Sequence, residues 1–181
     1  MHSRFSHSGV TLIETSVVSA ITAVVLSTVT PSFAGFIENR HVDGAATNLH
    51  ADIQFVRQEA VLRNQPVRLS FYKADNGKSC YVAHTGNHAD CGCDDRGQAT
   101  CTSPIRAIKT VAFSGADKVA VQANVSSILF DPLHGTSTPT GTLKVVAKSG
   151  RAVHHVVNVM GRVRSCSPHT NATSVPGYRA C

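Results

Sequence analysis

The sequence predicts an α+β fold in which one long N-terminal helix packs on antiparallel β-sheets. Three observations lead to this prediction. An apolar stretch near the N-terminus continues into an amphipathic helical pattern that stops at Pro66. Beyond Pro66, eight short runs alternate or are rich in β-branched residues, and turn residues separate them. The 181 residues, 42% of them hydrophobic, suit one domain with an extension and exclude a disordered chain.

The first half of the predicted helix is apolar. Val10–Thr30 contains one charged residue, Glu14. About twenty residues that rise about 1.5 Å each can cross a bilayer core of roughly 30 Å. A cleaved secretory signal peptide is the alternative, but the run is longer than its usual apolar region and lacks a small-x-small cleavage site. We therefore predict a retained transmembrane span over residues 10–34, with Arg4 on the cytoplasmic side.

Glu14 is unusual within this apolar stretch. A carboxylate that reaches the middle of a membrane costs up to about 2.5–3.5 kcal/mol and needs a partner. Cleavage after Gly9 would make Val10 a free N-terminus, and the amine of a neighbouring subunit could then compensate Glu14. The alternative is a carboxylate that extends to the membrane interface.

The second half of the helix is amphipathic. Its apolar positions recur at steps of three and four residues, at Val42, Ala45, Ala46, Leu49, Ile53, Val56 and Ala60. Asn64-Gln65-Pro66 ends the pattern, because proline disfavours helical geometry in the residue before it. One helix is therefore predicted from about Val10 to Arg63.

Eight strands are predicted after the helix. Turn residues separate them, for example Asp75-Asn76-Gly77 and Ser149-Gly150. The predicted strands are Val67–Tyr72, Cys80–His84, Ile105–Ala112, Val119–Gln122, Ser127–Phe130, Leu143–Ala147, Val153–Val159 and Arg162–Ser165.

The N-terminal motif SHSGVTLIET resembles a type IV prepilin signal. The resemblance implies cleavage between Gly9 and Val10 and N-methylation of Val10. It also implies assembly roles for Glu14 and for Pro31, which stands where pilins commonly kink this helix. Three further segments resemble the GspH/FimT family of minor pseudopilins: FVRQEAVLRNQPVRLSF (Phe55 to Phe71), ILFDPLHGT (Ile128 to Thr136) and GRVRSC (Gly161 to Cys166).

This resemblance implies a pilin-like fold and a non-enzymatic structural subunit without a cofactor. Its parts would be a leader (1–9), the transmembrane half of the helix (10–34) and a periplasmic domain (35–181). The subunit would be in or at the tip of a type IV pilus, anchored in the bacterial inner membrane before assembly and at the cell surface afterwards. The expected partners are other minor pilins, the major pilin, the prepilin peptidase and the inner-membrane assembly platform. The alternatives are a pseudopilin of a type II secretion system and a DNA receptor for natural transformation.

The six cysteines predict disulfide bonds, since the domain would lie in an oxidising compartment. The resemblance to pilins implies a Cys166–Cys181 bond that closes a C-terminal loop. The other four, Cys80, Cys91, Cys93 and Cys101, are expected to pair as Cys80–Cys91 and Cys93–Cys101, although spacing alone leaves their connectivity open. Their spacing does not fit a structural zinc site, so no metal site is predicted.

The ten histidines match no catalytic motif, and we expect those in strands, such as His154 and His155, to be exposed. The charge pattern is more informative. No Asp or Glu follows Asp131, whereas the same stretch contains six basic residues, and the net charge is +6. Arg162 and Arg164 should lie on one strand face about 7 Å apart, a spacing comparable to that of neighbouring phosphates.

Gly161-Arg162-Val163-Arg164 also resembles the GRxR motif of FimT-type pilins, which are linked to DNA uptake. Family members whose role is pilus priming have the same motif, so the motif alone does not decide between the two roles. Double-stranded DNA is therefore a further expected partner. A solvated basic face without a ligand is the alternative. The expected DNA contacts are Arg162, Arg164, Arg179, Lys144 and Lys148.

Overall fold

The structure, a computed structural model, describes residues 10–73, 78–169 and 173–181; the side chains of residues 28–32 and 115 are also left out. The chain divides into two compact units, Met1–Ile37 and Glu38–Cys181. Each unit is described by itself. The predicted leader and the predicted turn at Asp75-Asn76-Gly77 lie outside the described residues.

The predicted long helix is confirmed. Helix α1 (Leu12–Arg63) begins two residues later than expected and ends where expected. Asn64 follows it with a positive φ of 50°, and Pro66 comes next but one, so the chain leaves the helix there. Among the described residues, no helix combines the length and the hydropathy that crossing a membrane requires, and the transmembrane half expected at 10–34 stays a prediction.

Two antiparallel sheets make up most of the second unit, as predicted. The five-stranded sheet has the order β5-β2-β1-β7-β8, and the four-stranded sheet has the order β11-β10-β9-β6. The first contains β1 (Val67–Lys73), β2 (Ser79–His84), β5 (Ala107–Phe113), β7 (Ser127–Phe130) and β8 (Ser137–Thr138). The second contains β6 (Val119–Ala123), β9 (Gly141–Ala147), β10 (Ala152–Val157) and β11 (Val163–Cys166).

The sequence did not predict the small elements between β2 and β6. These are β3 (Cys91–Cys93), β4 (Ala99–Cys101) and two short 3₁₀ helices, η1 (His88–Asp90) and η2 (Gly115–Asp117). β3 and β4 form a two-stranded sheet of their own. Their segment is rich in Gly and Asp, which gives no strand pattern, and disulfide bonds hold it in place instead.

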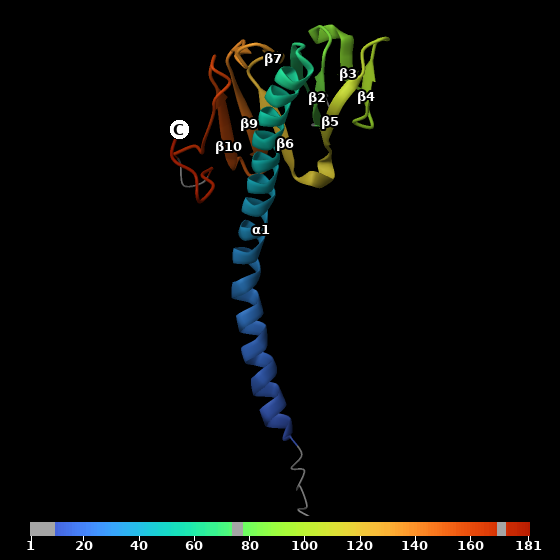
Figure 1. Cartoon of the computed structure of the whole chain (residues 1–181). Coiled ribbons are helices and arrows are strands. Elements are labelled where there is room, and N and C mark those ends of the chain that lie inside the picture. The colour runs from blue at the N-terminus through green and yellow to red at the C-terminus, as the bar shows by residue number, and fades with distance from the viewer. Residues whose placement is uncertain (1–9, 74–77, 170–172) are drawn as a thin grey trace, which may run out of the picture. The chain divides into compact units, whose positions relative to one another are not determined.

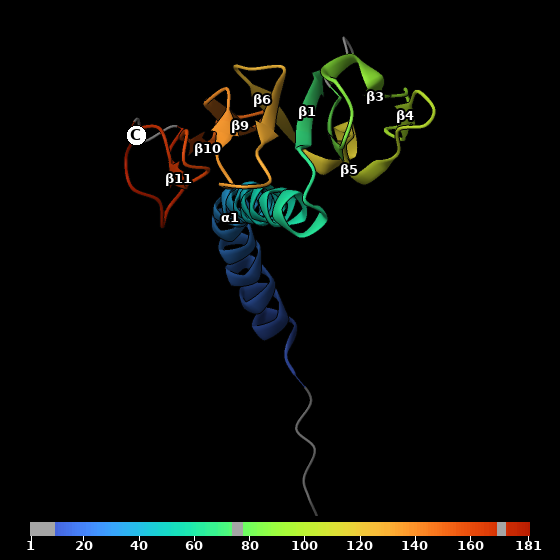
Figure 2. The ribbon, with the colours of Figure 1, turned by 45° about the horizontal axis from the view of Figure 1, so that its top comes forward.

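The core lies between the C-terminal half of α1 and the inner faces of both sheets (Figures 1 and 2). The predicted apolar face of the helix is buried there, with exposed fractions of 0–1% at Val42, Ala46, Leu49, Ile53, Val56 and Ala60. Leu69 of β1 and Leu143 and Val145 of β9 pack in the same core. Burial of these side chains stabilises the unit by about 1.5–3 kcal/mol per large residue.

One buried polar contact joins α1 to the five-stranded sheet. Asp52 is 6% exposed, and one of its carboxylate oxygens accepts a hydrogen bond of 2.8 Å from the Tyr81 hydroxyl of β2. The other oxygen lies 2.5 Å from Nζ of Lys109 in β5. Burial, followed by the bond to Asp52, raises the pKa of Tyr81, so its hydroxyl stays protonated and donates.

The disulfide bonds agree with the sequence analysis in one pair and differ in two. Cys166 is bonded to Cys181, as the pilin resemblance implies. The other pairs are Cys80–Cys93 and Cys91–Cys101, so the expected Cys80–Cys91 and Cys93–Cys101 bonds are wrong. Cys91 and Cys101 lie opposite each other in the β3–β4 register, with Cα atoms 4.0 Å apart, which decides their pairing. Cys93 is then left to bind β2 through Cys80.

Candidate functional site

The N-terminal part of α1 presents an apolar surface. Leu12 is 87% exposed, and Ile13, Val17 and Ile21 are exposed as well. Five residues of this segment each donate a hydrogen bond from the side-chain hydroxyl to a backbone carbonyl oxygen one turn earlier in the helix. They are Thr15, Ser16, Ser19, Thr22 and Ser27. Their polar atoms are thus already hydrogen-bonded within the helix, which leaves a surface suited to apolar partners.

Val10 and Glu14, the two described residues of the predicted processing and assembly motif, are both exposed. Glu14 lies in the first turn of α1, where its backbone N–H donates to the Thr11 hydroxyl at 3.3 Å. Gly9 lies outside the described residues. Pro31 lies within α1, and its side chain is not described.

The structure places two of the predicted DNA contacts, Lys144 and Arg164, on the outer face of the four-stranded sheet, and a third, Arg162, in the turn next to it. The β9–β10 and β10–β11 registers pair His154 with both Lys144 and Cys166, and Val156 with Arg164. Paired residues lie on the same face, so Lys144 and Arg164 share the face opposite the core. The predicted strand was to begin at Arg162, but β11 (Val163–Cys166) begins one residue later, so Arg162 lies in the turn before the strand, where it is exposed like Arg164. We call Lys144, Arg162 and Arg164 the basic face.

The other two predicted contacts lie at the margins of this sheet. Lys148 is exposed just after β9, at the turn into β10. Arg179 is exposed on the C-terminal segment, where its carbonyl oxygen accepts a hydrogen bond of 2.8 Å from the Ser167 N–H beyond β11. Within the described part of the chain, none of these five basic side chains makes an ion pair. Arg151, by contrast, lies 3.7 Å from the Glu38 carboxylate of α1.

The histidines of β10 differ in their environments. His154 lies among the basic residues, and partial burial together with the charge of Lys144 lowers its pKa, so it is neutral near pH 7. His155 points into the core and is 1% exposed. The expectation that strand histidines are exposed is therefore wrong for His155, and also for His84, which is fully buried. The reason is that hydrogen bonds from helix, strand and turn satisfy both rings in the core.

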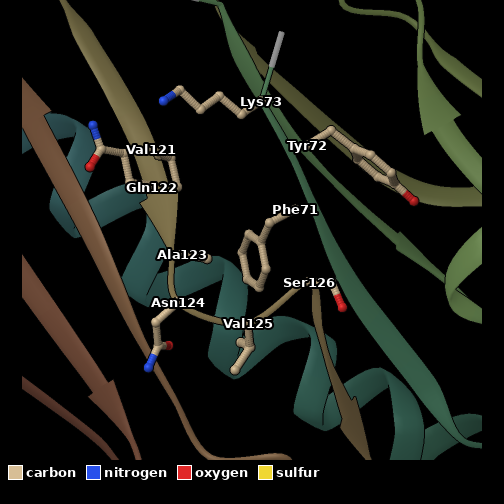
Figure 3. Close-up of a pocket in the computed structure, with 9 residues that line it drawn as sticks. All are labelled: Phe71, Tyr72, Lys73, Val121, Gln122, Ala123, Asn124, Val125 and Ser126. Carbon is tan, nitrogen blue, oxygen red and sulfur yellow. The ribbon is translucent and has the colours of Figure 1, made fainter.

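A shallow cleft lies between the two sheets, where the chain passes from β6 to β7 (Figure 3). The side chain of Phe71 points into it, Val125 lies at its base, and the Tyr72 ring points away from it. The backbone N–H of Phe71 donates to the Ser126 carbonyl at 2.9 Å and closes the end of the cleft. Lys73 is the one charged side chain among the described residues that line it.

One group of metal-ligating residue types occurs among the described residues. Donor atoms of His154, Cys166 and Cys181 lie within 4.8 Å of one another. Both cysteines are bonded to each other, so neither provides the thiolate that binds a metal.

The sequence analysis missed Arg57. Its side chain extends from α1 to two loops of the sheets, and its Nε donates to the Gly135 carbonyl at 2.8 Å. A Cβ atom on Gly161 would lie 3.0 Å from the same Nε. Both glycines have a positive φ, 62° and 70°. Gly161, directly before the Arg162–Arg164 motif, was the one feature in the sequence that indicated a close contact at this turn. The sequence could not show that the contact is with Arg57, 104 positions earlier.

Comparison with known proteins shows what the chain is similar to. Residues 45–161 match the family model described as type II transport protein GspH. A structure of the type IV minor pilin FimU from Pseudomonas aeruginosa is 16% identical, with a TM-score of 0.52, and the match covers 75% of this chain and 98% of that one. The minor pseudopilin EpsH from the Vibrio cholerae type II secretion system is 10% identical, with a TM-score of 0.47 over 72% and 99% of the two chains.

No curated protein sequence is significantly similar to this chain. The FimU match supports the fold, an N-terminal helix on antiparallel sheets.

Proposed function

The chain belongs to the GspH family and is a minor pilin or pseudopilin, and from this we propose that it is incorporated in or at the tip of a type IV pilus and supports pilus assembly. The family is one of structural subunits that associate with other pilins. The observation that carries the proposal is the apolar, exposed start of α1, which has Glu14 as its one charged residue. Such a surface needs apolar neighbours, which the helices of other subunits would provide.

The proposal includes processing and location. The prepilin peptidase cleaves between Gly9 and Val10, and the new N-terminus of Val10 is methylated. The inner membrane holds residues 10–34 before assembly, with the domain in the periplasm. The assembly platform then transfers the subunit to a filament with the major and other minor pilins, where Glu14 pairs with the N-terminal amine of a neighbour. Supporting this pairing, Glu14 makes no ion pair among the described residues, so its counter-charge would have to come from another subunit.

Replacement Glu14→Ala should spare cleavage but reduce recovery of the chain in sheared filaments about tenfold. The physical reason is that an apolar interface would bury the neighbour's amine without its counter-charge. Quantitative immunoblotting of sheared filaments and membranes measures the ratio, and mass spectrometry checks that the mature chain begins at Val10.

Glu59→Ala is the control, since Glu59 forms an exposed ion pair with Arg63 and belongs to the other unit. Equal recovery of the Glu14 variant and the wild type would exclude the assembly role of Glu14. If the chain were found only in filaments of a type II secretion system, its filament would be a pseudopilus and the proposed pilus role would be wrong.

A second function rests on a separate observation, the basic face. We propose that it binds the phosphates of double-stranded DNA weakly and without sequence preference, as a receptor for DNA uptake. Lys144 and Arg164 are exposed on one sheet face, Arg162 is exposed in the adjoining turn, and none of the three makes a described ion pair. Lys148 and Arg179 extend the cationic region at its margins. A guanidinium can donate two hydrogen bonds to one phosphate. Few such contacts imply micromolar or weaker affinity at physiological salt.

Replacing Arg162 and Arg164 together with Gln should weaken binding to an unrelated duplex and lower the salt slope by about two. The measurement is a salt titration with the mature full-length chain in a non-ionic detergent. The double variant Arg96→Gln/Arg106→Gln is the matched control, because it removes the same charge from exposed positions in loops between β3 and β5, away from the basic face. If both double variants lose the same affinity and slope, the basic face is not the DNA site.

A further inference from the structure

The β10–β11 hairpin carries Arg162 at its turn, and several hydrogen bonds hold this turn. The Arg162 N–H donates to the Asn158 side-chain oxygen at 2.9 Å, and the Gly161 N–H donates to the Asn158 carbonyl at 2.9 Å. Ser137 of β8 adds two bonds, from its N–H to the Val159 carbonyl and from its hydroxyl to the Asn158 carbonyl. The turn is thus attached to β8, which comes directly after the loop that contains Gly135.

Arg57 joins this pair of loops to α1. Its Nε donates to the Gly135 carbonyl at 2.8 Å, and Gly161 lies next to the same side chain. A Cβ on Gly161 would lie 2.6 Å from the Gly135 carbonyl oxygen and 3.0 Å from Nε of Arg57. The glycine of the Gly161–Arg164 motif therefore leaves room for a side chain of the helix.

We infer that Arg57 is a positioning residue for the basic face: it fixes the hairpin turn so that Arg162 points to the same phosphate-binding surface as Arg164 and Lys144. This inference rests on the proposed binding of DNA. A fixed turn lowers the conformational entropy that ordering Arg162 on a phosphate would cost. Without Arg57, the Gly135 loop would lose this hydrogen bond to the helix, and the adjoining Gly161 turn would be held less firmly, so Arg162 would sample other orientations.

Arg57→Gln should lower the affinity for an unrelated duplex about fivefold, which corresponds to about 1 kcal/mol, and reduce the salt slope by about one. Arg63→Gln is the matched control, because it removes the same charge from the same helix at a residue that pairs with Glu59, one turn earlier in α1. A loss that depends only on net charge would be equal in the two variants and would overturn the inference.

A double-mutant cycle with Arg162→Gln provides a readout that a merely structural role would not change. In the Arg162→Gln background, Arg57→Gln should have little further effect, since the side chain that it positions is gone. Additive losses of affinity would overturn the inference. If Arg57→Gln unfolds the protein, Arg57→Met keeps the apolar stem and takes its place.

Hydrogen exchange separates this inference from the proposed function. The amides of Gly161 and Arg162 should exchange about tenfold faster in the Arg57 variant of the mature chain, with or without DNA. Unchanged exchange at both amides would overturn the positioning role whether or not the protein binds DNA. If the Arg57 variant exchanges faster but the wild-type chain binds no duplex, the positioning of the turn stands and only the proposed DNA function is excluded.

Discussion

Asp52→Ala should lower the free energy of unfolding by about 3 kcal/mol. The replacement leaves the Tyr81 hydroxyl buried, 1% exposed at the residue level, without the carboxylate that accepts its hydrogen bond. It also removes the counter-charge of Lys109, which contributes less because the lysine side chain is 42% exposed. Denaturant unfolding of the mature chain in a non-ionic detergent, followed by circular dichroism, measures the change.

Two companion variants test the cause. Asp52→Asn keeps an oxygen that can accept the Tyr81 bond and loses only the charge, so it should cost about 1 kcal/mol. Tyr81→Phe combined with Asp52→Ala should cost less than the sum of the single losses, because the unpaired hydroxyl is then absent. If Asp52→Ala and Asp52→Asn lower the free energy of unfolding equally, the hydrogen bond from the Tyr81 hydroxyl does not contribute to the loss.

The domain should lose up to about 3 kcal/mol of stability as the pH falls from about 6.5 to about 4, through His155 alone. Nε2 of His155 lies 2.9 Å from the Ala46 carbonyl of α1, and Nδ1 lies 2.9 Å from the Ser165 hydroxyl of β11. A carbonyl can only accept, so Nε2 carries the proton and Nδ1 accepts from Ser165. The neutral ring thus bonds helix and sheet.

Burial, with the nearby rings of His50 and His154 as further causes, lowers the pKa of His155 to about 4, while the bond to Ala46 opposes the shift. The unfolded chain takes up a proton near pH 6.5 and the folded chain does so only near pH 4, so the unfolded state binds more protons in between. The contribution of His155 to stability is therefore constant above about pH 6.5 and decreases below it. Burial lowers the pKa of His84 as well, which adds to the loss in the same direction.

His155→Gln isolates this effect, because glutamine can donate to Ala46 and accept from Ser165 but does not titrate near these pH values. The variant should lose about 3 kcal/mol less than the wild type between pH 7 and pH 4, as unfolding at a series of pH values measures. Parallel pH profiles for the variant and the wild type would show that His155 is not the titrating group. His169→Gln, at an exposed position, is the control.

Local patterns in the sequence were sufficient for the long helix, its buried face and eight of the strands. Helical periodicity and alternation depend on neighbouring residues, so Val42, Leu49 and Val56 could be placed in the core before any contact was known. The prepilin-like motif and the segments similar to the GspH family also lie within short stretches. The same local rule predicted Arg162 and Arg164 on one strand face, but β11 begins at Val163 and Arg162 lies in the turn before it.

Contacts between distant segments could be found only in the tertiary structure. The β3–β4 register decides that Cys91 meets Cys101, and the spacing of the cysteines could not indicate it. Strand order brings Lys144 of β9 to the same face as Arg164 of β11 through β10.

The packing of α1 on the sheets determines the roles of Arg57 and His155, which contact Gly135 and Ala46 at separations of 78 and 109 residues. Hydrophobic periodicity shows which face of an element is buried, but it does not show which residue of another element that face meets. That pairing depends on side-chain shape and hydrogen bonding across the whole core, and the tertiary structure alone decides it.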